Sequence, residues 1–333
     1  MKIFITGSSG FIGFHLAKKL LDKGIKVQGL DSMNNYYDIN LKKSRLKILN
    51  KYKNFSFIKE SIQNDKKLSK CIIKFKPQII VHLAAQAGVR YSIKNPDTYL
   101  NANILGTFNI LKIANKIKVK HLIIGSSSSV YGANKKFPFQ ENDKTDHQVS
   151  FYAATKKSTE VLAHSYSSLW KLPITMLRFF TVYGPFGRPD MAYFKFTKKI
   201  LDGKKIDIYN KGKMYRDFTY IDDIVDGIYK LLNKIPSLNS KKRYKKDSLS
   251  PVAPFRILNI GNTKKILLLD FINTLEKELD KKIKRNYLPM QRGDVRSTLS
   301  NSSLLKRITG YNPKTKYQNG IKKFISWYKS YYN

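Results

Sequence analysis

The chain has 333 residues, of which 42% are hydrophobic, enough to bury a sizeable core in one or two domains. No apolar run approaches the roughly 20 residues that cross a bilayer. The apolar stretch at residues 2–6 runs into glycines and not into a signal-peptide cleavage site. Cys71 is the only cysteine, which excludes an internal disulfide framework and suits a reducing compartment. We therefore expect a soluble, cytoplasmic protein without membrane contact.

The formal net charge of +40 raises the question of nucleic-acid binding. Only 11 of the 63 basic residues are arginine, and the lysines are spread along the whole chain without a basic tail or arm. This distribution favours a lysine-rich, solvated surface over a nucleic-acid site. Nucleic acid is therefore not an expected partner.

The first half of the chain alternates apolar, β-branched runs with helix-length amphipathic segments. Strands are predicted at 2–6, 26–31, 55–59, 78–85, 121–127 and 174–183, and helices at 12–22, 66–75 and 99–116. Continuous apolar strands separated by helices are typical of a parallel sheet that is covered on both faces. We expect an α/β fold with a Rossmann-type, doubly wound parallel sheet, whose ligands bind beyond the carboxyl ends of the strands.

From about residue 173 the pattern loosens into shorter elements. Residues 235–254 are rich in Lys, Ser and Pro and predict a surface loop, whereas 267–279 and 320–331 have helical periodicity. We expect residues 1–172 to form the sheet domain, with segments returning from the second half. Residues 173–333 would mainly form a smaller C-terminal lobe that binds the substrate.

A glycine-rich loop directly follows the first strand and opens a helix; it reads Gly7-Ser8-Ser9-Gly10-Phe11-Ile12-Gly13. Glycine allows the tight turn and the close approach of backbone to a pyrophosphate, and the helix N-terminus offers free N–H groups. Asp31 ends the second strand, where a carboxylate accepts hydrogen bonds from a ribose and repels a 2′-phosphate. Ser32 and Met33 follow it instead of an arginine. The loop therefore predicts a dinucleotide site for NAD.

Tyr152 and Lys156 lie four residues apart on one helix face, after the fifth strand. A free tyrosine has a pKa of about 10, and a nearby ammonium group favours the phenolate and can also hold the nicotinamide ribose. The fifth strand ends in a serine run that contains Ser127 and Ser128. Their hydroxyls are placed to bind the hydroxyl that Tyr152 deprotonates. These residues predict a catalytic centre.

The glycine loop, Asp31, the serine run and the Tyr152/Lys156 pair resemble the extended short-chain dehydrogenase/reductases. Almost end to end, the chain is similar to the UDP-glucuronate 4-epimerases of that group. The stretches that carry this resemblance are 82–92, 152–156, 177–185, 187–191 and 216–223.

The resemblance implies roles for individual residues. Ser127 is the expected catalytic serine and Ser128 the next candidate. The further cofactor contacts that it implies are His82, Leu83, Ala84, Ala85 and Phe180, with Ser61 and Ile62 near the adenine. Thr181 and Arg188 match positions that hold the sugar carboxylate, and Arg90, Arg216 and Arg292 would contact the substrate or its diphosphate. Relatives usually have an acidic residue where this chain has Ser61.

The resemblance also implies a reaction and an assembly. Tyr152 would deprotonate the 4-hydroxyl of a UDP-sugar while carbon 4 loses a hydride to NAD, and the resulting 4-keto sugar would rotate and be reduced on its other face. The place of the Asp-Glu pair of 4,6-dehydratases, and of the glutamate of the decarboxylases, is taken by Ser128-Ser129, which favours epimerisation. We expect UDP-glucuronate as the substrate, a homodimer, and no metal. Two alternatives remain open: a 4-epimerase for a neutral UDP-sugar, and a non-catalytic NAD-binding scaffold.

Overall fold

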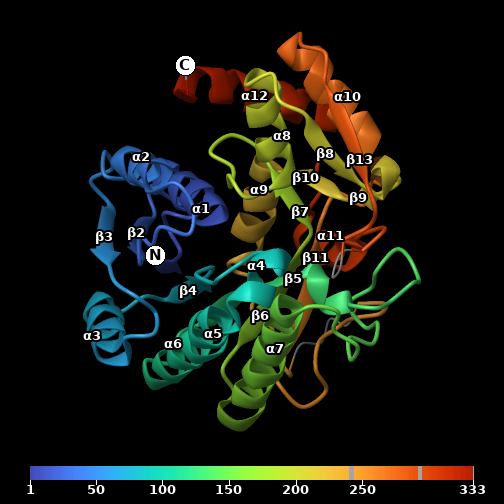
Figure 1. Ribbon diagram of the computed structural model, residues 1–333. Helices are drawn as coiled ribbons and strands as arrows, with labels where there is room; N and C mark the ends of the chain where they lie inside the picture. Colours follow the sequence, from blue (N-terminus) through green and yellow to red (C-terminus); the bar gives the residue numbers. More distant parts are fainter. Residues whose placement is uncertain (240–243, 292–294, 333) are drawn as a thin grey trace.

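The computed structural model describes residues 1–239, 244–291 and 295–332. Seven parallel strands form its main sheet in the order β11-β6-β5-β4-β1-β2-β3 (Figure 1). Their bounds are β1 (Lys2–Thr6), β2 (Lys26–Asp31), β3 (Phe55–Lys59), β4 (Ile79–His82), β5 (His121–Ser127), β6 (Ile174–Phe179) and β11 (Phe255–Ile260). The strand order reverses between β1 and β4, which is the position where doubly wound sheets bind ligands. The expected Rossmann-type fold is confirmed.

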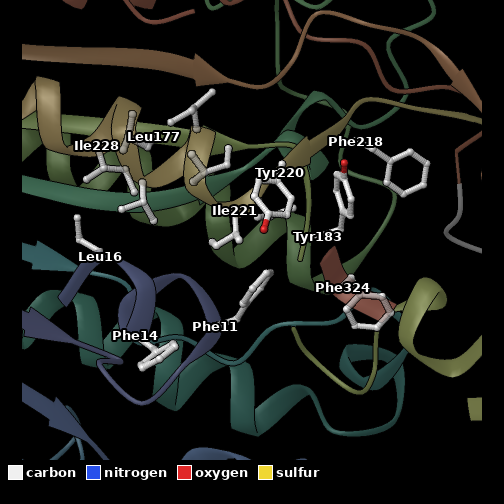
Figure 2. Close-up of a cluster of buried hydrophobic side chains, with 14 of the residues drawn as sticks. Phe11, Phe14, Leu16, Leu177, Tyr183, Phe218, Tyr220, Ile221, Ile228 and Phe324 are labelled. Atoms are coloured by element: carbon white, nitrogen blue, oxygen red, sulfur yellow. The ribbon is translucent and has the colours of Figure 1, made fainter. Parts of the chain in front are cut away.

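Helices cover both faces of this sheet. One apolar cluster joins the sheet to α1 (Phe11–Asp22), α9 (Ile221–Leu231) and α11 (Ser303–Thr309), and α2 (Ile39–Leu49) packs beside α1. Figure 2 shows part of this cluster, with Phe11 and Leu16 of α1 facing Ile221 and Ile228 of α9. The opposite face carries α3 (Asp65–Phe75), α6 (Gly106–Lys116) and α7 (Phe151–Trp170). The inner strands are therefore largely buried on both sides, which explains their nearly continuous apolar sequences, whereas the edge strand β3 is only partly buried.

The second half builds a smaller set of elements beyond the sheet. Its helices are α8 (Ala192–Leu201), α10 (Leu268–Leu279) and α12 (Tyr317–Tyr332), and in Figure 1 α10 and α12 lie on the opposite side of the molecule from α3 and α6. Its strand pairs are β7 (Thr181–Tyr183) with β10 (Phe218–Tyr220), β8 (Ile206–Tyr209) with β13 (Arg285–Leu288), and β9 (Tyr215–Arg216) with β12 (Ile266–Leu267). The remaining short helices are α4 (Val89–Lys94), α5 (Pro96–Tyr99), η1 (Leu100–Leu105), η2 (Ser128–Tyr131) and η3 (Asn210–Gly212).

Several boundaries differ from those predicted. The expected strand 174–183 is divided at Phe180, where the chain leaves the main sheet and pairs with β10 instead of β11. The expected strand 78–85 is shorter at both ends, since β4 runs only from Ile79 to His82. The described residues of 235–254 form no helix or strand, as predicted, and 240–243 lie outside the described part.

Candidate active site

One continuous cavity of about 1070 Å³ opens beyond the carboxyl ends of β1, β4 and β5. It brings together most of the residues that the sequence singled out. The predicted residues that line it are Gly7, Gly10, Phe11, Ile12, Gly13, Asp31, Ser61, Ile62, Leu83, Ala84, Ala85, Arg90, Ser127, Ser128, Tyr152, Lys156, Phe180, Thr181, Arg188 and Arg216.

Two predicted residues are not among them. The His82 side chain is buried in the sheet, where Nδ1 lies 2.7 Å from the Thr6 hydroxyl and Nε2 3.1 Å from the Thr107 hydroxyl. Burial, together with the nearby Lys156 charge, lowers the pKa of His82 to about 3. This neutral ring ties β4 to β1 and α6 and does not line the cavity, so a contact of His82 with the cofactor stays a prediction. Arg292 lies outside the described residues.

The glycine loop forms a cradle that a dinucleotide fits. Gly7 has φ +72°, and a Cβ on it would lie 2.8 Å from the backbone nitrogen of Ala84. A Cβ on Gly13 would clash with the Gly7 carbonyl. Helix α1 begins after Gly10 with no side-chain cap and no acidic residue in its first turn, so its N–H groups remain available to an anion. Side chains are thus excluded where a pyrophosphate needs close backbone contact.

Asp31 is held rigidly at the end of β2. Its carboxylate accepts hydrogen bonds from the backbone N–H groups of Ser9 (3.2 Å) and Met33 (2.9 Å), and Lys42 Nζ lies 3.7 Å away. This fixed carboxylate faces the cavity and can accept from ribose hydroxyls. Lys42 also lines the cavity and was not predicted from the sequence, because it lies on α2, a helix with little apolar periodicity.

Tyr152, on α7, is a partly buried residue of the cavity wall. Burial raises its pKa above the ordinary 10, while a hydrogen bond with Ser127 and the positive charge of Arg188 lower it. Asp190 opposes them by raising it. The structure thus places Ser127 against the tyrosine hydroxyl, with Ser128 beside it along the cavity.

Lys156 lies one helical turn after Tyr152 and points its amine at the end of β5. Nζ donates a hydrogen bond of 2.7 Å to the Gly125 carbonyl, and burial lowers the pKa of Lys156 to about 8 although the Glu160 carboxylate raises it. The groups that favour the Tyr152 phenolate in this structure are Ser127 and Arg188, whereas the sequence had pointed to Lys156.

Arg188 is held by an acidic neighbour that the sequence analysis missed. Its Nε and Nη2 atoms donate to the Asp190 carboxylate at 3.0 and 2.5 Å, and Tyr36 donates to the same carboxylate at 3.3 Å. All three side chains line the cavity. The pair uses one edge of the guanidinium and leaves Nη1 on the other. The spacing Arg188-Pro189-Asp190 was the only sequence signal for this contact.

The opposite wall supplies the remaining predicted residues. The Arg90 guanidinium lies 5.0 Å from the centre of the Tyr209 ring, and Arg216 Nη1 donates to the Tyr215 carbonyl at 2.9 Å. Thr181 directly follows Phe180 and begins β7. Its backbone N–H donates a hydrogen bond of 3.1 Å to the Asp217 carbonyl. Arginines from several segments therefore line the cavity, as a diphosphate or carboxylate ligand requires.

The described residues contain no group of three or more His, Cys, Asp or Glu side chains that could hold a metal ion. None of their helices combines the length and apolarity needed to cross a membrane.

Comparisons with known proteins agree with this geometry. Residues 3–245 match the model of the NAD dependent epimerase/dehydratase family. The chain is 50% identical to "Protein CapI" of Staphylococcus aureus, over 100% of this chain and 99% of that protein. It is 47% identical to a probable UDP-glucuronate 4-epimerase of Rhizobium meliloti, over 100% and 98%. The crystal structure of UDP-glucuronic acid 4-epimerase from Bacillus cereus with UDP-glucuronic acid and NAD covers all of both chains, with 34% identity and a TM-score of 0.89. The chain therefore belongs to the NAD-dependent epimerase/dehydratase family.

Proposed function

We propose that this protein interconverts UDP-glucuronate and UDP-galacturonate by epimerisation at carbon 4, using NAD that is regenerated in each cycle. The observation that carries the proposal is the position of Arg188. Its guanidinium lies close enough to Tyr152 to lower the pKa of the phenol, in the same cavity as the glycine loop. A sugar whose 4-hydroxyl meets Tyr152 would thus bring its carboxylate to an arginine.

Each residue of the centre has a distinct task in this reaction. The glycine loop and Asp31 would hold NAD, which when bound takes a hydride from carbon 4 and returns it to the opposite face. Tyr152 removes the proton of the 4-hydroxyl and gives it back after the sugar has turned. Ser127, which lies near enough to the Tyr152 hydroxyl to lower its pKa, would orient the reacting oxygen. Lys156, as an ammonium group, would help to hold the ribose of NAD and would favour the phenolate of Tyr152.

The carboxylate needs its own restraint during the reaction. A 4-keto glucuronate is a β-keto acid, which loses carbon dioxide when the breaking bond overlaps the ketone. Thr181 and Arg188 would hold the carboxylate in the ring plane, where this overlap is poor. Arginine suits the role because its planar fork binds a carboxylate through two hydrogen bonds.

Incubation of the protein with UDP-glucuronate, with and without added NAD⁺, tests the proposal. We expect UDP-galacturonate without net NADH; a pentose or deoxy-sugar product would refute it. Arg188→Ala should weaken substrate binding or increase UDP-pentose. Arg285→Ala is the matched control, because Arg285 pairs with Glu276 away from the cavity (2.9 Å). Unchanged affinity and product ratio in Arg188→Ala would contradict the carboxylate role.

One observation favours a second candidate, a 4-epimerase of neutral UDP-sugars. Asp190 already pairs with Arg188, so the charge of the guanidinium is compensated before any substrate binds. UDP-galactose and UDP-glucuronate offered in competition separate the two candidates by their kcat/KM values. A non-catalytic scaffold would convert neither sugar, although Tyr152 and Lys156 are both in place.

We also propose that the protein is a cytoplasmic homodimer. Apolar side chains are exposed along η1, α6 and α7, namely Leu100, Leu105, Phe108, Val161, Leu169 and Trp170. Phe108 and Trp170 are joined through Tyr166, whose ring centre lies 6.1 and 4.4 Å from theirs. Such a patch supports association of two copies. Light scattering should give twice the chain mass, and Leu169→Glu with Trp170→Glu should give the monomer.

A further inference from the structure

Arg45, on helix α2, is a completely buried arginine that does not line the cavity. Its Nη1 atom donates hydrogen bonds of 2.8 Å to the Ser9 carbonyl and 2.8 Å to the Tyr37 hydroxyl. Its Nη2 atom donates to the carbonyls of Phe186 (2.6 Å) and Gly187 (3.2 Å). One guanidinium therefore joins three separate stretches of the chain.

Two of these stretches carry the two halves of the cavity. Ser9 belongs to the glycine loop, in which Gly7 and Gly10 line the cofactor side. Phe186 and Gly187 directly precede Arg188, and we call residues 184–188 the Arg188 loop. The backbone of each loop is thus bonded to an opposite end of the same rigid, planar group.

The Arg188 loop also rests on the helix that the glycine loop opens. The Phe186 ring packs against Phe14 of α1 at 5.0 Å and against Trp327 of α12 at 4.9 Å. His15 Nε2 donates a hydrogen bond of 2.9 Å to the Pro185 carbonyl. Burial lowers the pKa of His15 to about 3, so the ring is neutral at physiological pH. Movement of α1 and of the Arg188 loop is therefore linked through packed contacts as well as through Arg45.

The charge of Arg45 makes its hydrogen bonds to both loops energetically important. Guanidinium stays charged in proteins, and the acceptors of Arg45 in the described part of the chain are three carbonyls and a phenol, none of them a carboxylate. Its Nε atom has no hydrogen-bond partner among the described residues. When either loop moves away, the buried guanidinium loses hydrogen bonds to carbonyl groups without regaining water, and this costs much free energy. The state in which both loops are seated is therefore strongly favoured over states in which one is displaced.

We propose that Arg45 is a positioning residue that couples the glycine loop to the Arg188 loop. As a result, NAD and the nucleotide sugar would each bind more tightly when the other is present. A ligand that orders one loop fixes the guanidinium and thereby seats the other loop. This inference rests on the proposed function only for the identity of the two ligands. Coupling between two sites is reciprocal, and typical values are about 5- to 150-fold in affinity.

The test measures the dissociation constant of NADH for the full chain by fluorescence, with and without saturating UDP. UDP serves as the probe because it lacks the sugar, so the result does not depend on which sugar is the substrate. In the wild-type protein we expect UDP to strengthen NADH binding at least about fivefold. In Arg45→Met we expect this ratio to fall within twofold of one, and in Arg45→Lys to be intermediate, because one amine cannot span both loops.

Arg256→Met is the matched control. Arg256 is equally an inward-facing arginine, 5% exposed, but it pairs with Asp247 (3.0 Å) and does not line the cavity. A purely structural role of Arg45 would lower both NADH affinities and leave their ratio unchanged, as we expect for Arg256→Met. A wild-type ratio near one, or an Arg45→Met ratio equal to that of the wild type, would overturn the proposal.

Hydrogen exchange of the wild-type protein decides the matter if neither Arg45 variant folds. Adding NADH alone should slow amide exchange in residues 184–188, and unchanged exchange there would overturn the coupling. The epimerase assay keeps the two proposals separate. Intact coupling without conversion of UDP-glucuronate refutes only the proposed function, whereas conversion with undiminished coupling in Arg45→Met refutes only this inference.

Discussion

Replacing Lys156 by methionine should stabilise the ligand-free protein at neutral pH while abolishing its activity. The Lys156 side chain is 7% exposed, and burial brings its pKa from the ordinary 10.5 down to about 8. That difference corresponds to about 3 kcal/mol, because one pKa unit is about 1.4 kcal/mol. The folded state bears this cost whenever the amine is protonated, and Lys156→Met removes it.

The gain is partly offset by one lost contact. The ammonium group donates a 2.7 Å hydrogen bond to the Gly125 carbonyl, and a charged hydrogen bond contributes about 1.5–3 kcal/mol. We therefore expect Lys156→Met to raise the free energy of unfolding by about 1 kcal/mol at pH 7. The cost of burying the charge is complete below pH 8 and disappears as the pH rises towards 10.5, since the folded state has lost its proton and the unfolded state has not. The advantage of the variant should thus vanish between these two values.

Paired denaturant unfolding of the NAD-free wild type and Lys156→Met at pH 7, 8, 9 and 10 measures this difference. The other lysines titrate alike in both proteins, so their contributions cancel. Lys157→Met is the control, because that amine is partly exposed on the same helix and binds the Thr145 hydroxyl. A Lys156→Met difference that changes with pH no more than that of Lys157→Met would refute the reasoning.

Three further predictions concern the same network. Tyr152→Phe should lower kcat by about 10²- to 10⁴-fold and leave UDP binding intact; calorimetry that shows lost binding would contradict the role in proton transfer. Glu160→Gln should lower the free energy of unfolding by roughly 3–5 kcal/mol, because it breaks a pair with Arg178 (two contacts of 2.9 Å) in which both side chains are 2% exposed. A denaturant midpoint within experimental error of the wild type would rule this out. Burial raises the pKa of Glu141 to about 7, so the wild type loses stability as the pH rises from 4.5 through 7. Relative to the wild type, Glu141→Gln should have a higher free energy of unfolding at pH 8 but not at pH 4. An equal difference at both pH values would contradict this prediction.

The sequence was most informative where burial dictates residue type. The predicted strands 2–6, 26–31, 55–59 and 121–127 coincide with β1, β2, β3 and β5. Period and composition suffice for β1, β2 and β5, because both of their faces are largely covered, whereas β3 lies partly exposed at the sheet edge. The glycine loop could also be predicted from the sequence, since the backbone contacts at Gly7 and Gly13 leave no room for a side chain.

The sequence was least informative where a polar side chain is satisfied by a distant segment. Helix α2 was not predicted, because its buried face includes Lys42 and Arg45, which periodicity assigns to solvent. The acceptors of Arg45 lie up to 142 residues away along the chain. The ring of His82 is another case, as its partners Thr6 and Thr107 come from two other elements. Hydrogen bonds of this kind leave no local pattern.

The contacts of Arg45 also have a consequence for synthesis of the protein. Residues emerge from the ribosome in order at about 5–20 per second. Phe186 follows Arg45 by 141 residues, so half of the acceptors of Arg45 are synthesised roughly 7–30 s after it. Trp327, which packs against Phe186, is synthesised later still. Throughout that interval the glycine loop lacks its connection through Arg45 to the Arg188 loop, and the apolar face of helix α1 is exposed. This is the state in which a chaperone would bind the nascent chain.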